Sequence, residues 1–158
     1  YNILNLSCTY KTLHFVYASS SSVYGENSKV PFKEDFLTDK PLSFYAATKK
    51  SNEIMAYSYS HIYKIPCTGL RIFTVYGPNA RPDMALFKFT KSILSSKKIN
   101  LYNYGNHIRD FTYIDDVVDG IEKLIKKPPR SKIPYEIYNI GSNKPKHLKE
   151  FLKILEKT

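Results

Sequence analysis

Short apolar runs alternate with longer amphipathic stretches along this chain. Residues 13–18 and 67–73 form continuous apolar runs rich in strand-forming residues, and residues 135–141 alternate apolar with polar side chains, so all three predict strands. Between the first two, Ser43 stands at an N-cap position and residues 44–63 follow a helical period. The side chains expected on the packing face of this helix include Ile54, Met55, Tyr57, Ser58 and Ile62. The order of these elements predicts an α/β fold with a parallel sheet.

The rest of the chain predicts shorter elements. Residues 1–10 are compatible with the end of a helix, and residues 26–42 read as a surface loop with two prolines. Asp115 can cap a helix that carries an apolar face to Ile125, and two prolines at 128 and 129 end it. The remaining predictions are a helix that opens at 81–86 and extends to about 95, a short strand and turn at 99–105, and a helix over 147–156.

Tyr45 and Lys49 stand one helical turn apart at the start of the predicted helix 44–63. This spacing puts a phenol and an ammonium on one face, within reach of one bound molecule. A neighbouring ammonium favours the ionised phenol, which can act as a general base toward an alcohol. The pair therefore predicts alcohol oxidation. A solvated helix face is the alternative, because a chain with 14 Tyr and many Lys shows this spacing by chance.

A run of serines from Ser19 to Ser22 directly follows the first apolar run. The serines lie at the predicted carboxyl end of a strand, which is the edge where open α/β sheets bind ligands. Serine clusters are also ordinary turn material. The Tyr45/Lys49 pair downstream favours the ligand-binding interpretation.

Composition narrows the class of protein. Across 158 residues, 42% are hydrophobic and 15% aromatic, which indicates a folded chain with a sizeable core, and no run approaches the roughly 20 apolar residues of a membrane helix. Cys8 and Cys67 lie in apolar contexts without a Cys-x-x-Cys motif, which favours reduced, buried thiols in a cytoplasmic protein. The four histidines show no metal-ligand spacing, so no metal site is predicted.

A formal net charge of +10 is compatible with a nucleic-acid surface, a membrane surface or an anionic substrate. The lysines are scattered and outnumber the arginines, which is typical of a solvated surface. We therefore expect no nucleic-acid and no membrane partner, while the positive field would still attract an anionic substrate.

A series of short motifs, in chain order, resembles a known family. The motifs are Ala-Ser-Ser-Ser-Ser-Val-Tyr-Gly from 18, Tyr-Ala-Ala-Thr-Lys-Lys from 45, Phe-Thr-Val-Tyr-Gly-Pro from 73, Arg-Pro-Asp-Met-Ala from 81 and Arg-Asp-Phe-Thr-Tyr-Ile-Asp-Asp from 109. Together they resemble the extended short-chain dehydrogenase/reductase family. The resemblance implies the C-terminal portion of a Rossmann-like, doubly wound parallel sheet with a small α/β substrate-binding domain. It also implies that Ser20, Tyr45 and Lys49 are catalytic, and that Tyr45, Lys49, Phe73 and Val75 contact NAD.

The positions after Ser20 discriminate among members of this family. Related dehydratases carry Asp-Glu directly after the catalytic hydroxyl, and uronate decarboxylases carry a Glu just before Val-Tyr-Gly, whereas this chain has Ser21 and Ser22 there. Without those acids, elimination and decarboxylation lack their proton-transfer group, and epimerisation at C4 remains. Thr74 also replaces the usual Asn. The motifs look most like the UDP-glucuronate 4-epimerases of capsule and cell-wall synthesis.

This resemblance implies contacts to all three parts of a UDP-sugar. Hydrogen bonds to the sugar carboxylate would come from Ser21, Ser22 and Thr74, bidentate bonds to the diphosphate from Arg109 and Arg81, and a contact near the uracil from Tyr102. For the two arginines the alternative is surface ion pairing with Asp83 and Asp110. For Tyr102 the alternative is ordinary core packing.

The glycine-rich phosphate turn of dinucleotide-binding folds is missing from this chain. The six glycines, at 25, 69, 77, 105, 120 and 141, never fall into a Gly-x-x-Gly-x-x-Gly or Gly-x-Gly-x-x-Gly pattern. In the resembling family this turn comes well before the catalytic Tyr. We therefore expect a partial chain, with the later part of an NAD-binding domain in residues 1–78 and mainly a substrate-binding region in 79–158. Segments at about 111–128 would return to the first domain.

The resemblance thus implies NAD-dependent conversion of UDP-glucuronate to UDP-galacturonate by a cytoplasmic homodimer. Two alternatives stay open. One is an epimerase of neutral UDP-hexoses or N-acetylhexosamines, and the other is a truncated, non-catalytic remnant or basic binding module.

Overall fold

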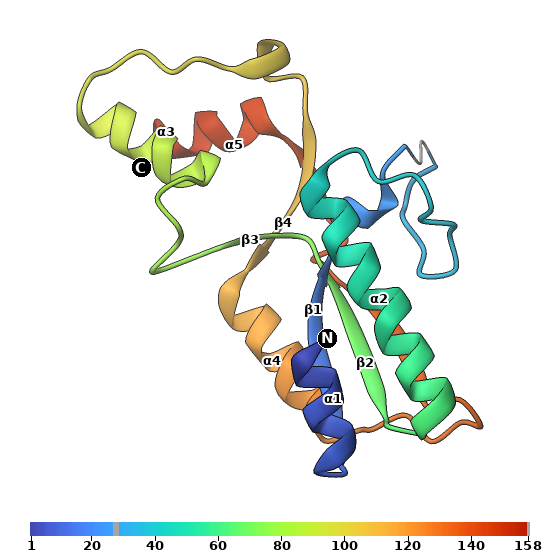
Figure 1. Cartoon of the computed structure of the whole chain (residues 1–158). Helices are drawn as coiled ribbons and strands as arrows, with labels where there is room; N and C mark the ends of the chain where they lie inside the picture. The colour runs from blue at the N-terminus through green and yellow to red at the C-terminus, as the bar shows by residue number, and fades with distance from the viewer. Residues whose placement is uncertain (27–28, 158) are drawn as a thin grey trace. The chain divides into compact units, whose positions relative to one another are not determined.

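The computed structural model describes residues 1–26 and 29–157, and it divides them into two compact units (Figure 1). The first unit is formed by residues 1–73 and 118–140, and the second by residues 74–117 and the chain from Gly141 onward. From the sequence, the boundary was expected after residue 78 and the returning segment at about 111–128. In the structure the returning segment includes residues 135–140, because these pair with a strand of the first unit.

The first unit contains a parallel sheet of three strands in the order β1-β2-β5. The strands are β1 (Phe15–Ser20), β2 (Cys67–Ile72) and β5 (Tyr135–Ile140). Phe15 pairs with Cys67 and Cys67 with Tyr135, so the strands start level and their carboxyl ends meet at one edge. The predicted parallel sheet is confirmed. Its first strand is shifted by two residues relative to the prediction, because Leu13 is 87% exposed and two serines continue the strand.

Helices cover both faces of this sheet. Side chains alternate between the faces along each strand. On one face, Cys67 packs in an apolar cluster with Leu4 of α1 (Asn2–Thr9) and Ala56 of α2 (Phe44–Tyr63). Thr68 points to the other face, where its hydroxyl contacts His14 Nε2 at 2.8 Å, and His14 Nδ1 lies 3.0 Å from the Ile125 carbonyl at the end of α4 (Ile114–Ile125). Coverage of both faces is the doubly wound arrangement that was predicted.

Helix α2 positions the candidate chemistry, and its boundaries follow the prediction. The Ser43 hydroxyl accepts a hydrogen bond from the Ala46 amide at 3.1 Å, and the helix ends at Lys64, which adopts a left-handed conformation. The predicted packing face is confirmed for Met55, which packs against the core, and is wrong for the exposed residues Ile54, Tyr57, Ser58 and Ile62. The buried residues are instead Ala46, Glu53, Ala56 and Ser60. Small side chains allow α2 to lie close to the sheet, and the one large buried residue is charged.

The second unit contains three strands, of which two have only three residues each. They are β3 (Thr74–Tyr76), β4 (Ile108–Tyr113) and β6 (Pro145–His147), with β4 parallel to β3 and antiparallel to β6. Two helices, α3 (Ala85–Leu94) and α5 (Leu148–Leu155), belong to this unit. The ring of Phe151 stacks on that of Phe111 with centroids 4.4 Å apart, which packs α5 against β4.

Several predictions in this unit are wrong. A short strand and turn were expected at 99–105, but no strand forms there. Residues 102–105 instead form a 3-10 helix, η2 (Tyr102–Gly105), in which Asn103 and Tyr104 take left-handed backbone angles that a strand cannot contain. Asp115 lies inside the first turn of α4 rather than at its cap, because β4 runs directly into the helix. Strands β4 and β6 were not predicted, since they exist by pairing with each other across more than thirty intervening residues.

The predicted loop 26–42 follows the serine cluster, and residues 27 and 28 lie outside the described residues. The end of this loop packs closely against Gly25, which precedes it in the chain. Its φ is +56°, and a Cβ added there would lie 1.9 Å from the backbone oxygen of Lys40. Only glycine fits this position without a shift of the backbone.

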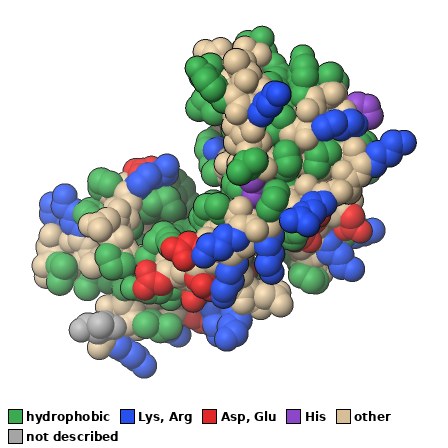
Figure 2. Space-filling view, turned by 90° about the horizontal axis from the view of Figure 1, so that it is seen from below, with side chains coloured by type: hydrophobic (Ala, Val, Ile, Leu, Met, Phe, Trp, Pro, Cys, Tyr) green, Lys and Arg blue, Asp and Glu red, His purple; other side chains and the backbone are tan. Residues whose placement is uncertain are grey.

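Within the described part of the chain, no helix combines the length and the apolar character needed to cross a membrane. The basic side chains are spread over the face seen in Figure 2, with acidic side chains among them. This pattern agrees with the solvated, lysine-rich surface expected from the sequence.

Candidate active site

The serine cluster sits where β1 ends and a short 3-10 helix, η1 (Ser21–Tyr24), begins. Ser20 Oγ accepts hydrogen bonds from the Ser22 amide at 3.2 Å and from Ser22 Oγ at 3.0 Å. A hydroxyl oxygen has two acceptor sites and one proton. With both acceptor sites in use, the Ser20 hydroxyl is left to donate its own proton to a ligand.

Tyr45 and Lys49 lie beside this cluster on the first turns of α2. Lys49 Nζ donates to the Ala18 carbonyl at 2.9 Å and lies 5.7 Å from the centre of the Tyr45 ring. The Tyr45 side chain is 54% exposed. The structure therefore brings Lys49 to the strand residue two positions before Ser20. The solvent-accessible ring of Tyr45 lies beside Lys49. An ammonium has three donors, so Lys49 retains two for a ligand.

The predicted cofactor contacts Phe73 and Val75 fall on either side of the boundary between the units. Phe73 follows β2 directly, and its amide donates to the Ile140 carbonyl at 3.0 Å, which fixes the chain at the carboxyl edge of the sheet. Val75 lies half-buried in β3, next to Thr74. Thr74 pairs in register with Phe111.

The two arginines predicted to bind the diphosphate have local partners in the second unit. Arg81 Nε and Nη2 donate to the Asp83 carboxylate at 3.1 and 3.0 Å, so it forms the surface ion pair that was the alternative. Arg109 Nη1 donates to the Ile108 carbonyl at 2.9 Å. The carboxylate of Asp110 accepts instead from the Asn143 amide at 2.8 Å and from Ser142.

Tyr102 lies in η2 and is 87% exposed. Core packing, the alternative role for this ring, is therefore wrong. An exposed aromatic ring is available for stacking on a ligand base, although its role stays a prediction.

Ser19 of the serine run belongs to a buried network of charged and polar groups, which was not predicted from the sequence. Glu53 of α2 accepts from Arg71 Nε at 2.9 Å, from Arg71 Nη2 at 3.0 Å and from Ser19 Oγ at 2.6 Å. Lys50 Nζ lies 3.4 Å from the same carboxylate. Two signals were present in the sequence. Glu53 follows Lys49 by one helical turn, and Arg71 is the one charged residue in the apolar run 67–73.

The environment of this network determines its charge state. Burial disfavours the carboxylate of Glu53, but the hydrogen bonds from Arg71 and Ser19 outweigh burial and hold the pKa of Glu53 below its usual value. Burial likewise disfavours the Arg71 guanidinium, but Glu53 raises its pKa, so both partners are ionised. Tyr24, whose ring lies 4.8 Å from Arg71 Cζ, has a raised pKa because it is buried.

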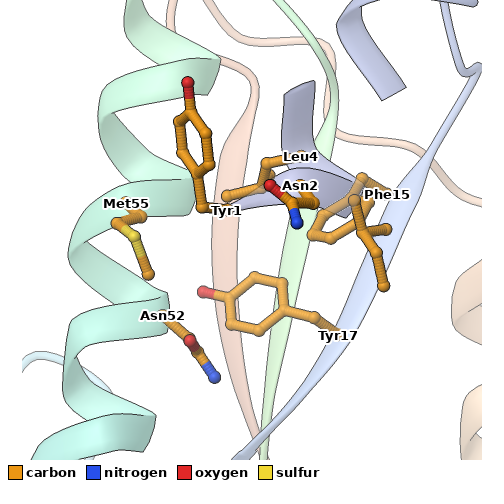
Figure 3. A pocket seen from close by; sticks show the side chains of 8 residues that line it. Tyr1, Asn2, Leu4, Phe15, Tyr17, Asn52 and Met55 are labelled. Atoms are coloured by element: carbon orange, nitrogen blue, oxygen red, sulfur yellow. The ribbon is translucent and has the colours of Figure 1, made fainter. Parts of the chain in front are cut away.

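A cavity of about 480 Å³ lies in the first unit (Figure 3). Its walls come from the N-terminal residues, β1 and α2, and include Tyr1, Leu4, Tyr17 and Met55. The Tyr17 hydroxyl lies 2.9 Å from that of Tyr135, and burial raises the pKa of both phenols. None of the predicted catalytic residues lines this cavity.

Comparison with known proteins gives a family match over most of the chain. The family model described as "NAD dependent epimerase/dehydratase family" matches residues 1–141. The chain is 53% identical to "Protein CapI" of Staphylococcus aureus and 44% identical to a "Probable UDP-glucuronate 4-epimerase" of Rhizobium meliloti, over 98% and 99% of its own length. It covers 51% and 50% of those proteins, so it spans about half the length of the curated relatives it matches.

A solved structure shows the same fold. The crystal structure of UDP-glucuronic acid 4-epimerase from Bacillus cereus, in complex with UDP-glucuronic acid and NAD, matches with a TM-score of 0.89 at 38% sequence identity. The match covers 98% of this chain and 48% of that one. With the family model matched over most of the chain, this protein belongs to the NAD-dependent epimerase/dehydratase family.

Proposed function

We propose that the protein containing this chain is an NAD-dependent nucleotide-sugar 4-epimerase that interconverts UDP-glucuronate and UDP-galacturonate. The observation that supports the proposal is that Lys49 Nζ, which lies 5.7 Å from the centre of the Tyr45 ring, donates to the Ala18 carbonyl just before the serine cluster at the carboxyl end of β1. Relatives described as UDP-glucuronate 4-epimerases support the choice of substrate.

NAD fits one part of this chain. At the carboxyl edge of the sheet, Lys49 retains two donors and the Tyr45 phenol is accessible, which suits the nicotinamide ribose and a reacting alcohol. The glycine-rich turn that holds the phosphates of a dinucleotide does not occur in the 158 residues. When bound, NAD would supply the chemistry of removing a hydride from C4 and returning it.

The residues of the first unit would manage the proton at the sugar 4-hydroxyl. Tyr45, as phenolate, would take this proton, and Lys49 would stabilise the negative charge on the phenol oxygen. Ser20 would donate its free hydroxyl proton to the same sugar oxygen, since its acceptor sites are filled by Ser22. After the sugar has turned its other face toward the cofactor, Tyr45 would return the proton to the oxygen at C4, which completes the change of configuration.

Serine and threonine hydroxyls would bind the carboxylate of the sugar. The keto form of a uronate is a β-keto acid and loses carbon dioxide readily, so an epimerase must hold the carboxylate where that loss is slow. Ser21 and Thr74 supply neutral donors for this purpose and no competing negative charge, whereas the Ser22 hydroxyl already donates its proton to Ser20 Oγ. The same positions lack the acid that elimination at C5 would need.

Arg81, Arg109 and Tyr102 remain our proposed contacts to the diphosphate and the uracil. The ion pair between Arg81 and Asp83 is exposed on both sides, and such pairs contribute only about 0–1 kcal/mol. A diphosphate can therefore replace Asp83 as the partner of Arg81 at little cost.

We further propose a cytoplasmic homodimer that serves polysaccharide synthesis. Both cysteines are free, and Cys67 is fully buried in the apolar cluster, which suits a reducing compartment. The neighbouring helices α1 and α2 carry exposed apolar side chains, among them Ile3, Leu6, Ile54 and Ile62, which suit an interface with a second copy.

The test uses the complete natural reading frame that contains these residues. We expect the purified protein to interconvert UDP-glucuronate and UDP-galacturonate, and to act at least tenfold more slowly on UDP-glucose and UDP-N-acetylglucosamine. Tyr45→Phe should lower kcat by about 10²- to 10⁴-fold, the range for loss of a general base. Tyr63→Phe removes a hydroxyl from the other end of α2 and should leave kcat unchanged.

Preference for a neutral UDP-sugar would support the alternative epimerase. Absence of turnover and of NAD binding would support the non-catalytic remnant. In the same assay Thr74→Ala should raise the share of decarboxylated pentose product, and an unchanged product ratio would remove Thr74 from the carboxylate site.

A further inference from the structure

Three consecutive residues at the end of β1 each form a hydrogen bond in or next to the proposed catalytic group. The Ala18 carbonyl accepts from Lys49 Nζ at 2.9 Å, Ser19 Oγ donates to Glu53 Oε1 at 2.6 Å, and Ser20 Oγ accepts from Ser22. The middle contact is buried, whereas the contact of Lys49 is exposed and that of Ser20 is partly buried. The bond between Ser19 and Glu53 therefore lies between the anchor of Lys49 and the hydroxyl of Ser20.

Glu53 shares a helix face with the catalytic pair. Tyr45, Lys49 and Glu53 follow each other at intervals of four residues, so all three project from α2 on the same side. The side chains of Glu53 and Arg71 are 3% and 4% exposed and form two parallel hydrogen bonds. A buried pair of this geometry resists displacement, because any slide or rotation of α2 would leave a charge unpaired.

Arg71 extends the same constraint to η1 and the following loop. Its Nη1 donates to the Glu34 carbonyl at 3.1 Å, and its guanidinium lies over the ring of Tyr24. The Tyr24 hydroxyl donates to Asn139 Oδ1 of β5 at 2.7 Å. The guanidinium that holds α2 thus also holds the segment that carries Ser21 and Ser22.

We propose that Ser19, Glu53 and Arg71 are positioning residues for the epimerase reaction. They set the register of α2 on β1, and so fix Tyr45 and Lys49 relative to Ser20. Their effect on turnover rests on the proposed epimerase activity, whereas their effect on NAD affinity rests only on the proposed contact between Lys49 and the NAD ribose. None of the three needs to touch the sugar.

Ser19→Ala is the sharpest test. It removes the hydrogen bond to Glu53 but leaves the pair with Arg71 intact, so no charge is left unpaired. Because a small misplacement of catalytic groups is costly, we expect kcat to fall about tenfold while KM for the UDP-sugar changes less than about twofold. In calorimetric titration without sugar, NAD affinity should weaken about threefold, because Lys49 is the proposed ribose contact.

Thr68→Val is the matched control. Thr68 is a buried hydroxyl in the neighbouring strand whose bond to His14 lies on the opposite face of the sheet. Its loss should lower the melting temperature by a similar amount and leave kcat and NAD affinity unchanged. Equal loss of kcat in both variants would show that the effect follows stability, and would overturn the proposal.

The two proposals fail in different ways. Wild-type protein that binds NAD but does not turn over UDP-sugars would refute the proposed function. NAD affinity would then decide the role of Ser19 by itself: a threefold loss in Ser19→Ala but not in Thr68→Val supports positioning. Unchanged affinity and unchanged kcat in a folded Ser19→Ala variant overturn it.

Discussion

Ser22 is the residue whose role the structure changes most. The sequence analysis assigned its hydroxyl to the substrate carboxylate, but in the structure that hydroxyl and the Ser22 amide both donate to Ser20 Oγ. A donor that is already committed has only its lone pairs left for a ligand, and a carboxylate cannot use them. We therefore expect Ser22 to orient the Ser20 proton rather than to bind the substrate carboxylate.

Substitution of Ser22 separates these roles. Ser22→Ala keeps the amide donor and removes the hydroxyl. We expect kcat to fall about three- to tenfold with KM unchanged, because this factor corresponds to the loss of roughly one hydrogen bond. Ser22→Thr retains the hydroxyl and should restore most of the loss. Steady-state kinetics with UDP-glucuronate provides the measurement. A raised KM with unchanged kcat in Ser22→Ala would instead indicate that Ser22 binds the carboxylate alone.

Other residues show what a sequence pattern can and cannot find. The spacing of Tyr45 and Lys49 predicts a shared helix face, and the structure places Lys49 5.7 Å from the Tyr45 ring. Glu53 lies on the same face but was not predicted as a buried charge. Whether a carboxylate is buried depends on a partner, and Arg71 is distant in sequence and adjacent only in the fold.

At the scale of elements, α2 is held to the sheet by charge as well as by apolar contact. Its buried positions are two alanines, a serine and Glu53, whereas most of its large apolar residues face outward. An interface of small side chains buries little apolar area, and loss of one partner of the Glu53–Arg71 pair would leave the other charge buried and unpaired beneath this helix.

This arrangement predicts a pH dependence of stability. The pKa of Glu53 is lowered in the fold, so its contribution is present above the unfolded pKa of about 4.3 and is lost as pH falls through the folded pKa. Glu53→Gln should therefore destabilise the protein by about 3–5 kcal/mol at pH 7, because Arg71 is left unpaired. The difference in melting temperature from wild type should shrink as pH falls below about 4.

Asp119→Asn is the control for that experiment. Asp119 pairs with Lys123 on the exposed side of α4, and exposed pairs contribute about 0–1 kcal/mol. Its melting curves should follow wild type at every pH. A difference between Glu53→Gln and wild type that stays constant from pH 7 to pH 3 would show that the charge of Glu53 is not what stabilises α2.

At the scale of the whole molecule, the proposed homodimer makes a direct prediction. If the exposed apolar side chains of α1 and α2 bind a second copy, Ile54→Glu should shift the protein from dimer to monomer, because it places a charge in a desolvated interface. Light scattering after size-exclusion chromatography measures the mass. Ile154→Glu changes a similarly exposed residue of α5 in the second unit and should remain dimeric. A monomeric wild type would remove the proposal.

The sequence by itself determined the parallel strands, the bounds of α2, the pairing of Tyr45 with Lys49 and the family resemblance. These features are local, because they depend on the period of apolar residues and on spacing within one element. The tertiary structure alone decided the Glu53–Arg71 pair, the bonds from Ser22 to Ser20, the strands β4 and β6, and the 3-10 helix at Tyr102. The ion pair and the two strands depend on which distant segments meet, because charge pairing and strand pairing arise only when they do. The Ser22–Ser20 bonds and the 3-10 helix are local, but they depend on backbone angles that the period of apolar residues does not reveal.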